Sequence, residues 1–140
     1  MNKFSATIIS PEKTLFEGEI EELLLPTENG QIGILPNHAP LVSKIAHGEA
    51  VIKNGSSKDA LVLFGGFVHV LNDRSVIVLA DSAYHIEEIN EKEAQAAKER
   101  AEQLLVTKEV RDDKTRFAEI QSELLKSITA LKALRKYRKK

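Results

Sequence analysis

The 140-residue sequence contains no cysteine and no tryptophan, and only 5% of its residues are aromatic. Without cysteine the chain cannot form disulfides or thiolate zinc sites, which fits a reducing compartment. No apolar run approaches the ~20 residues that a membrane-spanning helix needs, and the first residues lack the apolar stretch of a signal peptide. We therefore expect no direct insertion into a membrane.

Glycine and proline are restricted to the first half of the chain, and residues 89–140 contain neither. Up to about Ala80, short β-branched or apolar runs alternate with turn residues, and Asn54-Gly55 favours a tight hairpin turn. Strands this short leave no room for crossover helices, so an antiparallel sandwich or barrel is favoured over an α/β fold. The sequence thus predicts a β domain over residues 1–88.

Residues 89–140 are rich in Ala, Glu, Lys, Gln, Leu and Arg, which favour helices. Asn90 can cap a first helix whose apolar face is mostly alanine, and residues 106–114 form the expected interhelical turn. In the second helix, apolar residues recur every three or four positions on one stripe, namely Phe117, Ile120, Leu124, Ile128 and Leu131. This pattern predicts an antiparallel two-helix hairpin that is less stable than the β domain.

The net charge of −1 hides an uneven distribution of charge. All 21 acidic residues precede Lys126, and the seven basic residues from Lys126 onward have no acidic neighbours in that segment. This basic segment can be a solvated helix end that is well placed against the helix dipole, or it can be an electrostatic docking surface.

Side chains that could carry chemistry do not form a recognisable motif. The four histidines show neither HExxH nor i,i+4 spacing, so we expect no metal site. Glu21 and Glu22, if they share a strand, point to opposite faces. Gly65-Gly66 lacks the context of a phosphate loop and predicts a bulge or tight strand connection. A basic tail with a single aromatic residue, Tyr137, is a weak nucleic-acid signal. We expect no catalytic residues, no cofactor and no nucleic acid.

The most unusual segment is residues 30–40, GQIGILPNHAP, in which two glycines and two prolines fix an irregular backbone. It can be a rigid loop with no further role. It can equally be a shaped recognition surface, since loops held by a sandwich commonly bind partners.

At this loop the chain resembles the epsilon subunits of F-type ATP synthases from bacteria and plastids, and the mitochondrial delta subunit. The resemblance includes Ser10-Pro11-Glu12, Leu15-Phe16-Glu17-Gly18-Glu19, GQIGILPNHAPLV, Gly48, Gly65-Gly66-Phe67-Val68 and VIVLADSA at residues 76–83. These motifs follow in order over roughly the first 88 residues. The helix-forming composition of the remainder fits the family's C-terminal hairpin.

The resemblance implies a sandwich of about ten strands over residues 1–88 that clamps the foot of the gamma subunit and rests on the c-ring. Such a subunit is a non-catalytic part of the rotor that couples proton flow to ATP synthesis. It would be peripheral, at the cytoplasmic face of the cell membrane or at a plastid thylakoid. The residues expected to face the c-ring are Gln31, Pro36, Asn37 and His38.

For residues 89–140 the resemblance implies a regulatory hairpin that inhibits ATP hydrolysis by contact with the alpha and beta subunits. Contact with acidic loops of beta is expected for Lys126, Lys132, Arg135, Lys136 and Arg138. Some relatives bind ATP through an Ile/Leu-Asp-x-x-Arg-Ala motif at the start of the first helix. Here Asn90 and Glu93 replace its Asp and Arg, and an acid repels a triphosphate, so no nucleotide site is expected.

Two other interpretations remain open at the level of sequence. One is a stand-alone interaction module, in which a β-sandwich carries a coiled helical hairpin that docks on another assembly. The other is an enzyme for a small ligand, which no combination of nucleophile, base and orienting group supports.

Overall fold

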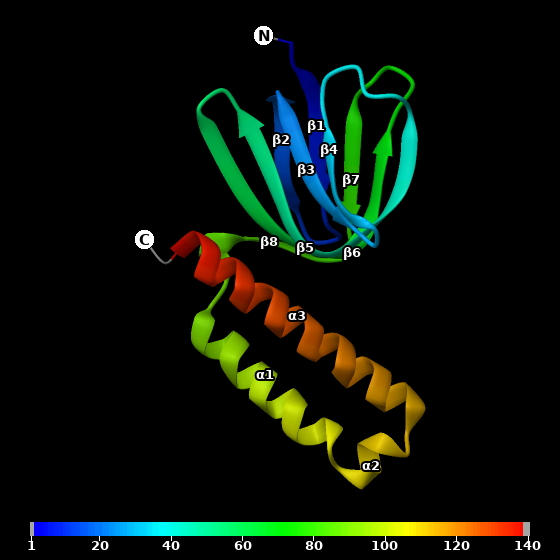
Figure 1. Ribbon diagram of the computed structural model, residues 1–140, viewed down its shortest axis with the longest axis vertical. Helices are drawn as coiled ribbons and strands as arrows, with labels where there is room; N and C mark the ends of the chain where they lie inside the picture. The colour runs from blue at the N-terminus through cyan, green and yellow to red at the C-terminus, as the bar shows by residue number, and fades with distance from the viewer. Residues whose placement is uncertain (1, 139–140) are drawn as a thin grey trace. The chain divides into compact units, whose positions relative to one another are not determined.

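The computed structural model describes residues 2–138, and the chain divides into two compact units, Met1–Ile86 and Glu87–Lys140. The first unit is built from strands and the second from helices (Figure 1). The strands are β1 (Phe4–Ile9), β2 (Thr14–Ile20), β3 (Glu22–Thr27), β4 (Gly30–Ile34), β5 (Leu41–Asn54), β6 (Ser57–Val70), β7 (Val76–Ala80) and β8 (Ala83–His85).

The strands hydrogen-bond in the order β2-β1-β7-β6-β5-β3-β4. β8 pairs with the first half of β6, and β7 pairs with its second half. Among the described residues β1–β7 is the parallel pair, with Ala6 opposite Val76, and the other pairs are antiparallel. The longest ladder joins β5 to β6 and runs from Leu41↔Val70 to Asn54↔Ser57. Asn54-Gly55 forms the turn between these strands, as the sequence predicts.

One hydrophobic core lies between the curved layers of the strand unit, because alternate side chains of each strand point inward. Its fully buried members come from strands throughout the hydrogen-bonding order of the sheet. They include Ile8, Leu23, Ile34, Leu61, Leu63 and Val68. This core is drawn from residues 4–83 and is complete within the first unit.

The predicted β-sandwich followed by a helical hairpin is confirmed, with two differences of detail. The described residues form eight strands and not about ten, because β5 and β6 are 14 residues long and each contributes to both layers. In addition, Gly65 and Gly66 do not connect two strands. They lie inside β6, where its partner changes from β8 to β7.

Gly66 has φ +123°, a backbone conformation that side chains with a Cβ rarely adopt. A Cβ at this position would overlap the carbonyl oxygen of Leu79 and stand 2.8 Å from the Cα of Ala80. Only glycine therefore allows β7 to lie this close to β6.

We predict that Gly66→Ala destabilises the sandwich by roughly 3 kcal/mol, from about 1–2 kcal/mol of backbone strain and about 1–3 kcal/mol of overpacking. Gly55→Ala is the matched control, because Gly55 also has a positive φ of +64° but no atom lies within 4 Å of the Cβ position. Gly55→Ala should show the cost of the backbone strain without the cost of overpacking. Urea unfolding measures both variants, and equal destabilisation by the two would contradict the steric argument.

The second unit is a helical hairpin, in which α1 (Glu91–Leu105) and α3 (Lys114–Arg138) run side by side in opposite directions (Figure 1). A 3₁₀ turn, η1 (Ile86–Glu88), precedes it. Asn90 caps α1 as predicted, since its side-chain oxygen accepts a 3.1 Å hydrogen bond from the backbone N–H of Glu93. The expected turn over residues 106–114 is not wholly irregular, because it contains the four-residue helix α2 (Lys108–Arg111).

Candidate functional site: surfaces of the sandwich and the hairpin

The loop over residues 35–40 follows the edge strand β4 and is shaped by one tight turn. The backbone N–H of His38 donates to the carbonyl of Leu35 at 3.2 Å, and Asn37 has a left-handed φ of 66°. The ring Nδ1 of His38 lies 2.7 Å from the carbonyl oxygen of Ala39. Leu35 is 55% exposed, so the turn presents an apolar side chain to solvent.

The four residues predicted for the c-ring surface do not form one cluster. Pro36, Asn37 and His38 are consecutive in the turn, with Asn37 exposed and the other two half-buried. Gln31 is exposed and pairs with Pro26 at the start of β4, next to the turn that joins β3 to β4. Because β4 extends about 3.3 Å per residue, Gln31 is separated from the loop by most of the strand. The sequence spacing alone did not reveal this separation.

Two shallow hollows border this loop. One, of about 520 Å³, is lined by Asn2, Glu21, Glu22, Leu35, Pro36, Lys53 and Gly55. Glu21 and Glu22 do not share a strand, because Glu21 lies between β2 and β3, and both residues border this hollow. The Glu21 carboxylate accepts a 2.6 Å hydrogen bond from the Gly55 N–H, and Glu22 lies 3.6 Å from the Lys53 ammonium, so both carboxylates have partners.

The second hollow, of about 320 Å³, includes Asn37 in its lining and is polar. Its lining residues are Lys3, Phe4, Ser5, Glu19, Asn37, Asp73, Arg74 and Ser75. Hydrogen bonds from the hydroxyl of Ser75, at 2.6 Å, and from its backbone N–H, at 2.9 Å, hold the pKa of Asp73 below its usual value. These hydrogen bonds close the turn between β6 and β7.

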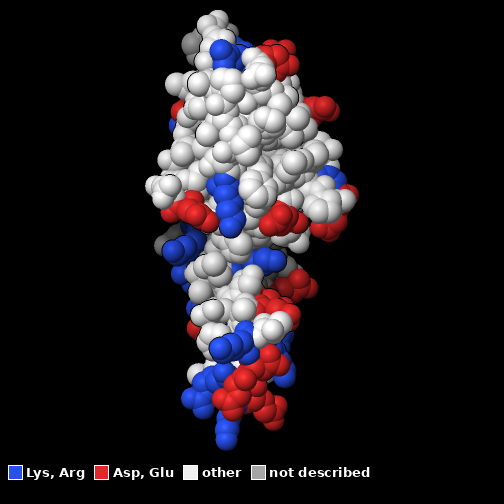
Figure 2. All heavy atoms as spheres, turned by 90° about the vertical axis from the view of Figure 1, so that its right-hand side faces the viewer, with Lys and Arg blue, Asp and Glu red and all other residues white. Residues whose placement is uncertain are grey.

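An exposed apolar surface, not predicted above, lies on the outer face of β5, β6 and β7. Phe67 is 52% exposed and pairs across the ladders with Lys44 on β5 and with Leu79 on β7, which is 50% exposed. Val42, which is 65% exposed, stands opposite His69. We call Val42, Phe67 and Leu79 the outer apolar face. Figure 2 shows that this side of the sandwich has few charged groups, which gather toward its rim.

A signal for this face was present in the sequence. In β7 the inward residues Val76, Val78 and Ala80 alternate with Ile77 and Leu79, so the strand is apolar on both sides. A solvent-facing side of an antiparallel sheet is normally polar, and an exposed apolar patch marks an interaction surface. The run VIVLA thus predicts a covered outer face.

The predicted basic surface lies on α3. Lys126, Lys132, Arg135 and Lys136 are exposed, and the ammonium of Lys136 lies 5.5 Å from the ring centroid of Tyr137. The spacing of three and four places Lys132, Arg135 and Lys136 on one side of the helix. Within residues 2–138, Lys126, Lys132 and Arg135 make no ion pair. The side chain of Arg138 lies outside the described residues.

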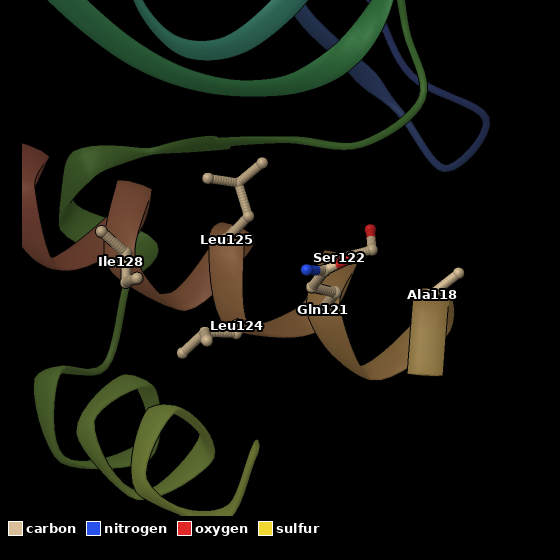
Figure 3. Close-up of a pocket in the computed structure, with 6 residues that line it drawn as sticks. All are labelled: Ala118, Gln121, Ser122, Leu124, Leu125 and Ile128. Atoms are coloured by element: carbon tan, nitrogen blue, oxygen red, sulfur yellow. The ribbon is translucent and has the colours of Figure 1, made fainter. Parts of the chain in front are cut away.

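α3 also presents apolar side chains on two sides. Leu124 points toward α1, whereas Leu125 points away from it (Figure 3). Leu124 packs on the cluster of the hairpin, and Leu125 is 50% exposed. A hollow of about 500 Å³ along this helix is lined by Ala118, Gln121, Ser122, Leu124, Leu125 and Ile128. None of these lining groups is ionisable near neutral pH, so the hollow is unsuited to acid–base catalysis.

Within the described residues, no group of three or more His, Asp or Glu side chains could hold a metal ion. In the same part of the chain, no helix is both long and apolar enough to cross a membrane.

The family model for the β-sandwich domain of the ATP synthase delta/epsilon chain matches residues 3–86. The chain therefore belongs to the ATP synthase delta/epsilon family, as its motifs indicated. It is 38% identical over 134 residues to the ATP synthase epsilon chain of Janthinobacterium sp. (strain Marseille), covering 95% of this chain and 94% of the relative. It is 41% identical over 126 residues to that of Desulforamulus reducens, covering 90% and 92%.

Solved structures share the fold. A chain in the cryo-EM structure of Euglena gracilis mitochondrial ATP synthase, titled OSCP/F1/c-ring in rotational state 1, superposes with a TM-score of 0.81 at 22% identity. The match covers 94% of this chain and 81% of that one. A chain of the Tetrahymena thermophila mitochondrial ATP synthase central stalk and c-ring gives a TM-score of 0.54 at 15% identity, covering 62% and 69%.

The start of α1 bears directly on nucleotide binding. The side chain of Asn90 is occupied in capping the helix, and Glu93, at the position where the resemblance implies an arginine in ATP-binding members of the family, is exposed. We predict that the full chain shows no saturable ATP binding by titration calorimetry up to millimolar nucleotide, because the first turn of α1 carries the two carboxylates of Glu91 and Glu93 against the single cation of Lys92. A dissociation constant in the micromolar range would show that other residues supply the phosphate contacts.

Proposed function

We propose that this chain is a non-catalytic subunit of the central stalk of a proton-translocating F-type ATP synthase. In this role it turns with the gamma subunit and the c-ring and transmits torque, while catalysis belongs to the alpha and beta subunits. It is peripheral to the membrane, at its cytoplasmic face in a bacterial cell, and reaches the membrane through its partners.

The outer apolar face carries this proposal, because a free-standing subunit gains nothing from exposing Phe67 and Leu79 side by side. We assign the gamma subunit to this face. Aromatic and aliphatic groups with few charges among them are typical of the core of a lasting protein interface. Here Lys44 lies beside Phe67 and pairs with Glu28. The loop over residues 35–40, with Pro36, Asn37 and His38, is assigned to the c-ring together with Gln31.

We further propose that residues 1–88 serve attachment and residues 89–140 serve regulation. On α3, Lys126, Lys132 and Arg135 make no ion pair within the described residues, and acidic loops of beta are the complementary surface. Contact between them holds back ATP hydrolysis. The contacts are exposed and individually weak, so this brake is reversible.

We predict that Leu79→Asp weakens binding to purified gamma at least tenfold, because it places a charge on the outer apolar face directly beside Phe67. Leu35→Asp is the matched control, since Leu35 is equally exposed but lies in the loop before β5. It should leave the affinity for gamma unchanged. Surface plasmon resonance measures both. Co-purification with gamma and the alpha–beta hexamer also separates this function from a stand-alone module, which would not assemble with them.

We predict that the triple change Lys132→Gln, Arg135→Gln and Lys136→Gln raises ATP hydrolysis by the reconstituted complex about threefold or more and leaves proton-driven synthesis intact. Exposed pairs contribute ~0.2–1 kcal/mol each, and 1.4 kcal/mol changes a population ratio about tenfold. High salt should partly reproduce the effect. The control is Lys108→Gln, Arg111→Gln and Lys114→Gln, which removes the same charge near α2. Unchanged hydrolysis in the first variant would make the basic segment a solvated helix end.

A further inference from the structure

The strand unit contains two Asn-Gly pairs, and both lie in turns between antiparallel strands. Asn29-Gly30 belongs to the turn between β3 and β4, and Asn54-Gly55 to the turn between β5 and β6. The two turns lie at opposite ends of the strands (Figure 1). One dipeptide therefore stands in two different surroundings within the same chain.

An Asn-Gly pair is a site of self-modification, because glycine has no side chain to shield its peptide nitrogen. Hydroxide takes the proton of the glycine N–H, and the nitrogen attacks the side-chain carbonyl carbon of asparagine, so that a C–N bond forms and the oxygen becomes an oxyanion. The bond from this carbon to Nδ2 then breaks, and the amide group takes a proton from water and leaves as ammonia. Water opens either carbonyl of the resulting succinimide, which yields aspartate or isoaspartate.

The folded turn holds every group of Asn54-Gly55 that this reaction needs. The Asn54 Nδ2 donates a 3.2 Å hydrogen bond to the carbonyl of Glu19, and the Gly55 N–H donates a 2.6 Å hydrogen bond to the carboxylate of Glu21. A carboxylate is far too weak a base to take a proton from a peptide N–H, and its negative charge opposes an anion on the same nitrogen. The Asn54 Oδ1 is buried and has no hydrogen-bond partner within residues 2–138, so no donor stabilises the oxyanion there.

The groups of Asn29 are free by comparison. Asn29 is exposed, and its side-chain amide makes no hydrogen bond within the described residues. The turn is held instead by Thr27, whose hydroxyl donates to the carbonyl of Gly30 at 2.6 Å and accepts from the backbone N–H of Asn29 at 3.3 Å. Gly30 belongs to the last pair of the ladder between β3 and the edge strand β4, where local fraying opens the backbone most readily. Water can also solvate an oxyanion at this exposed side chain.

We propose that Asn29-Gly30 is a site of spontaneous deamidation in the native protein, and that Glu21 and the carbonyl of Glu19 protect Asn54-Gly55 from the same reaction. Conversion of Asn29 adds a negative charge beside Glu28 and two residues before Gln31. Isoaspartate also adds one carbon to the main chain within the turn. An effect on contact with the c-ring rests on the proposed function, whereas the modification itself does not.

The test incubates the full-length chain in mildly alkaline buffer and follows the two Asn-Gly peptides by mass spectrometry, which detects the replacement of an amide by a carboxyl group. Electron-transfer dissociation distinguishes isoaspartate from aspartate. We expect conversion at Asn29 to be about tenfold or more faster than at Asn54, because a charge-assisted hydrogen bond must break at Gly55 before the nitrogen attacks. In urea the two rates should become similar, since both pairs are then unprotected.

Glu21→Ala should raise the rate at Asn54 about tenfold and leave the rate at Asn29 unchanged, because it removes the acceptor of the Gly55 N–H. Glu22→Ala is the matched control, since the neighbouring carboxylate pairs with Lys53 and not with Gly55. Glu21→Gln supplies a second variant, which keeps an acceptor oxygen and removes only the charge, so the rate at Asn54 should rise by a smaller factor. Equal native rates at the two pairs, no conversion at Asn29, or an equal rise in Glu22→Ala would overturn the proposal.

Discussion

The pairing of β5 with β6 is the interaction on which the sandwich depends. These two 14-residue strands lie at the centre of the strand order, and β3 attaches to one of them while β7 and β8 attach to the other. Their inward residues supply the middle of the core, and their outward residues supply Val42 and Phe67 of the outer apolar face. One ladder therefore fixes both the interior and the main candidate docking surface, so that the surface is as rigid as the core behind it.

The outer apolar face is hydrophobic and lies on a rigid sheet, whereas the basic side of α3 is charged and lies on a helix. The two candidate surfaces therefore suit two kinds of attachment. Apolar groups on a rigid sheet give an interface that salt hardly affects and that loses little conformational entropy on binding. Long basic side chains on a helix give contacts that are weak, salt-sensitive and easily broken. The proposed function, a subunit that stays attached to a rotor and also regulates it, uses both. The division between strands and helices along this chain keeps them separate.

The strand half, the hairpin and the Asn90 cap could be predicted from the sequence, because turn residues, helical spacing and capping chemistry are local signals. The inward position of Val110 could not, since β-branched residues beside Asp112-Asp113 favour an irregular turn until tertiary packing overrides that preference. The separation of Gln31 from His38 depends on where β4 begins and ends. The outer apolar face depends on register between strands far apart in sequence, although the two-sided pattern of β7 indicated it.

The parallel pairing of β1 with β7 has a consequence for how the protein is made. Ala6 lies opposite Val76, so a strand at the start of the chain finds its partner only after about 70 further residues have been synthesised. At ~5–20 residues per second the ribosome takes roughly 4–15 s to produce them. Throughout that interval β1 can pair only with β2, as an incomplete hairpin with an open edge. Closure of the sandwich therefore waits for the translation of β7, and the nascent chain is most vulnerable to aggregation just before that strand emerges.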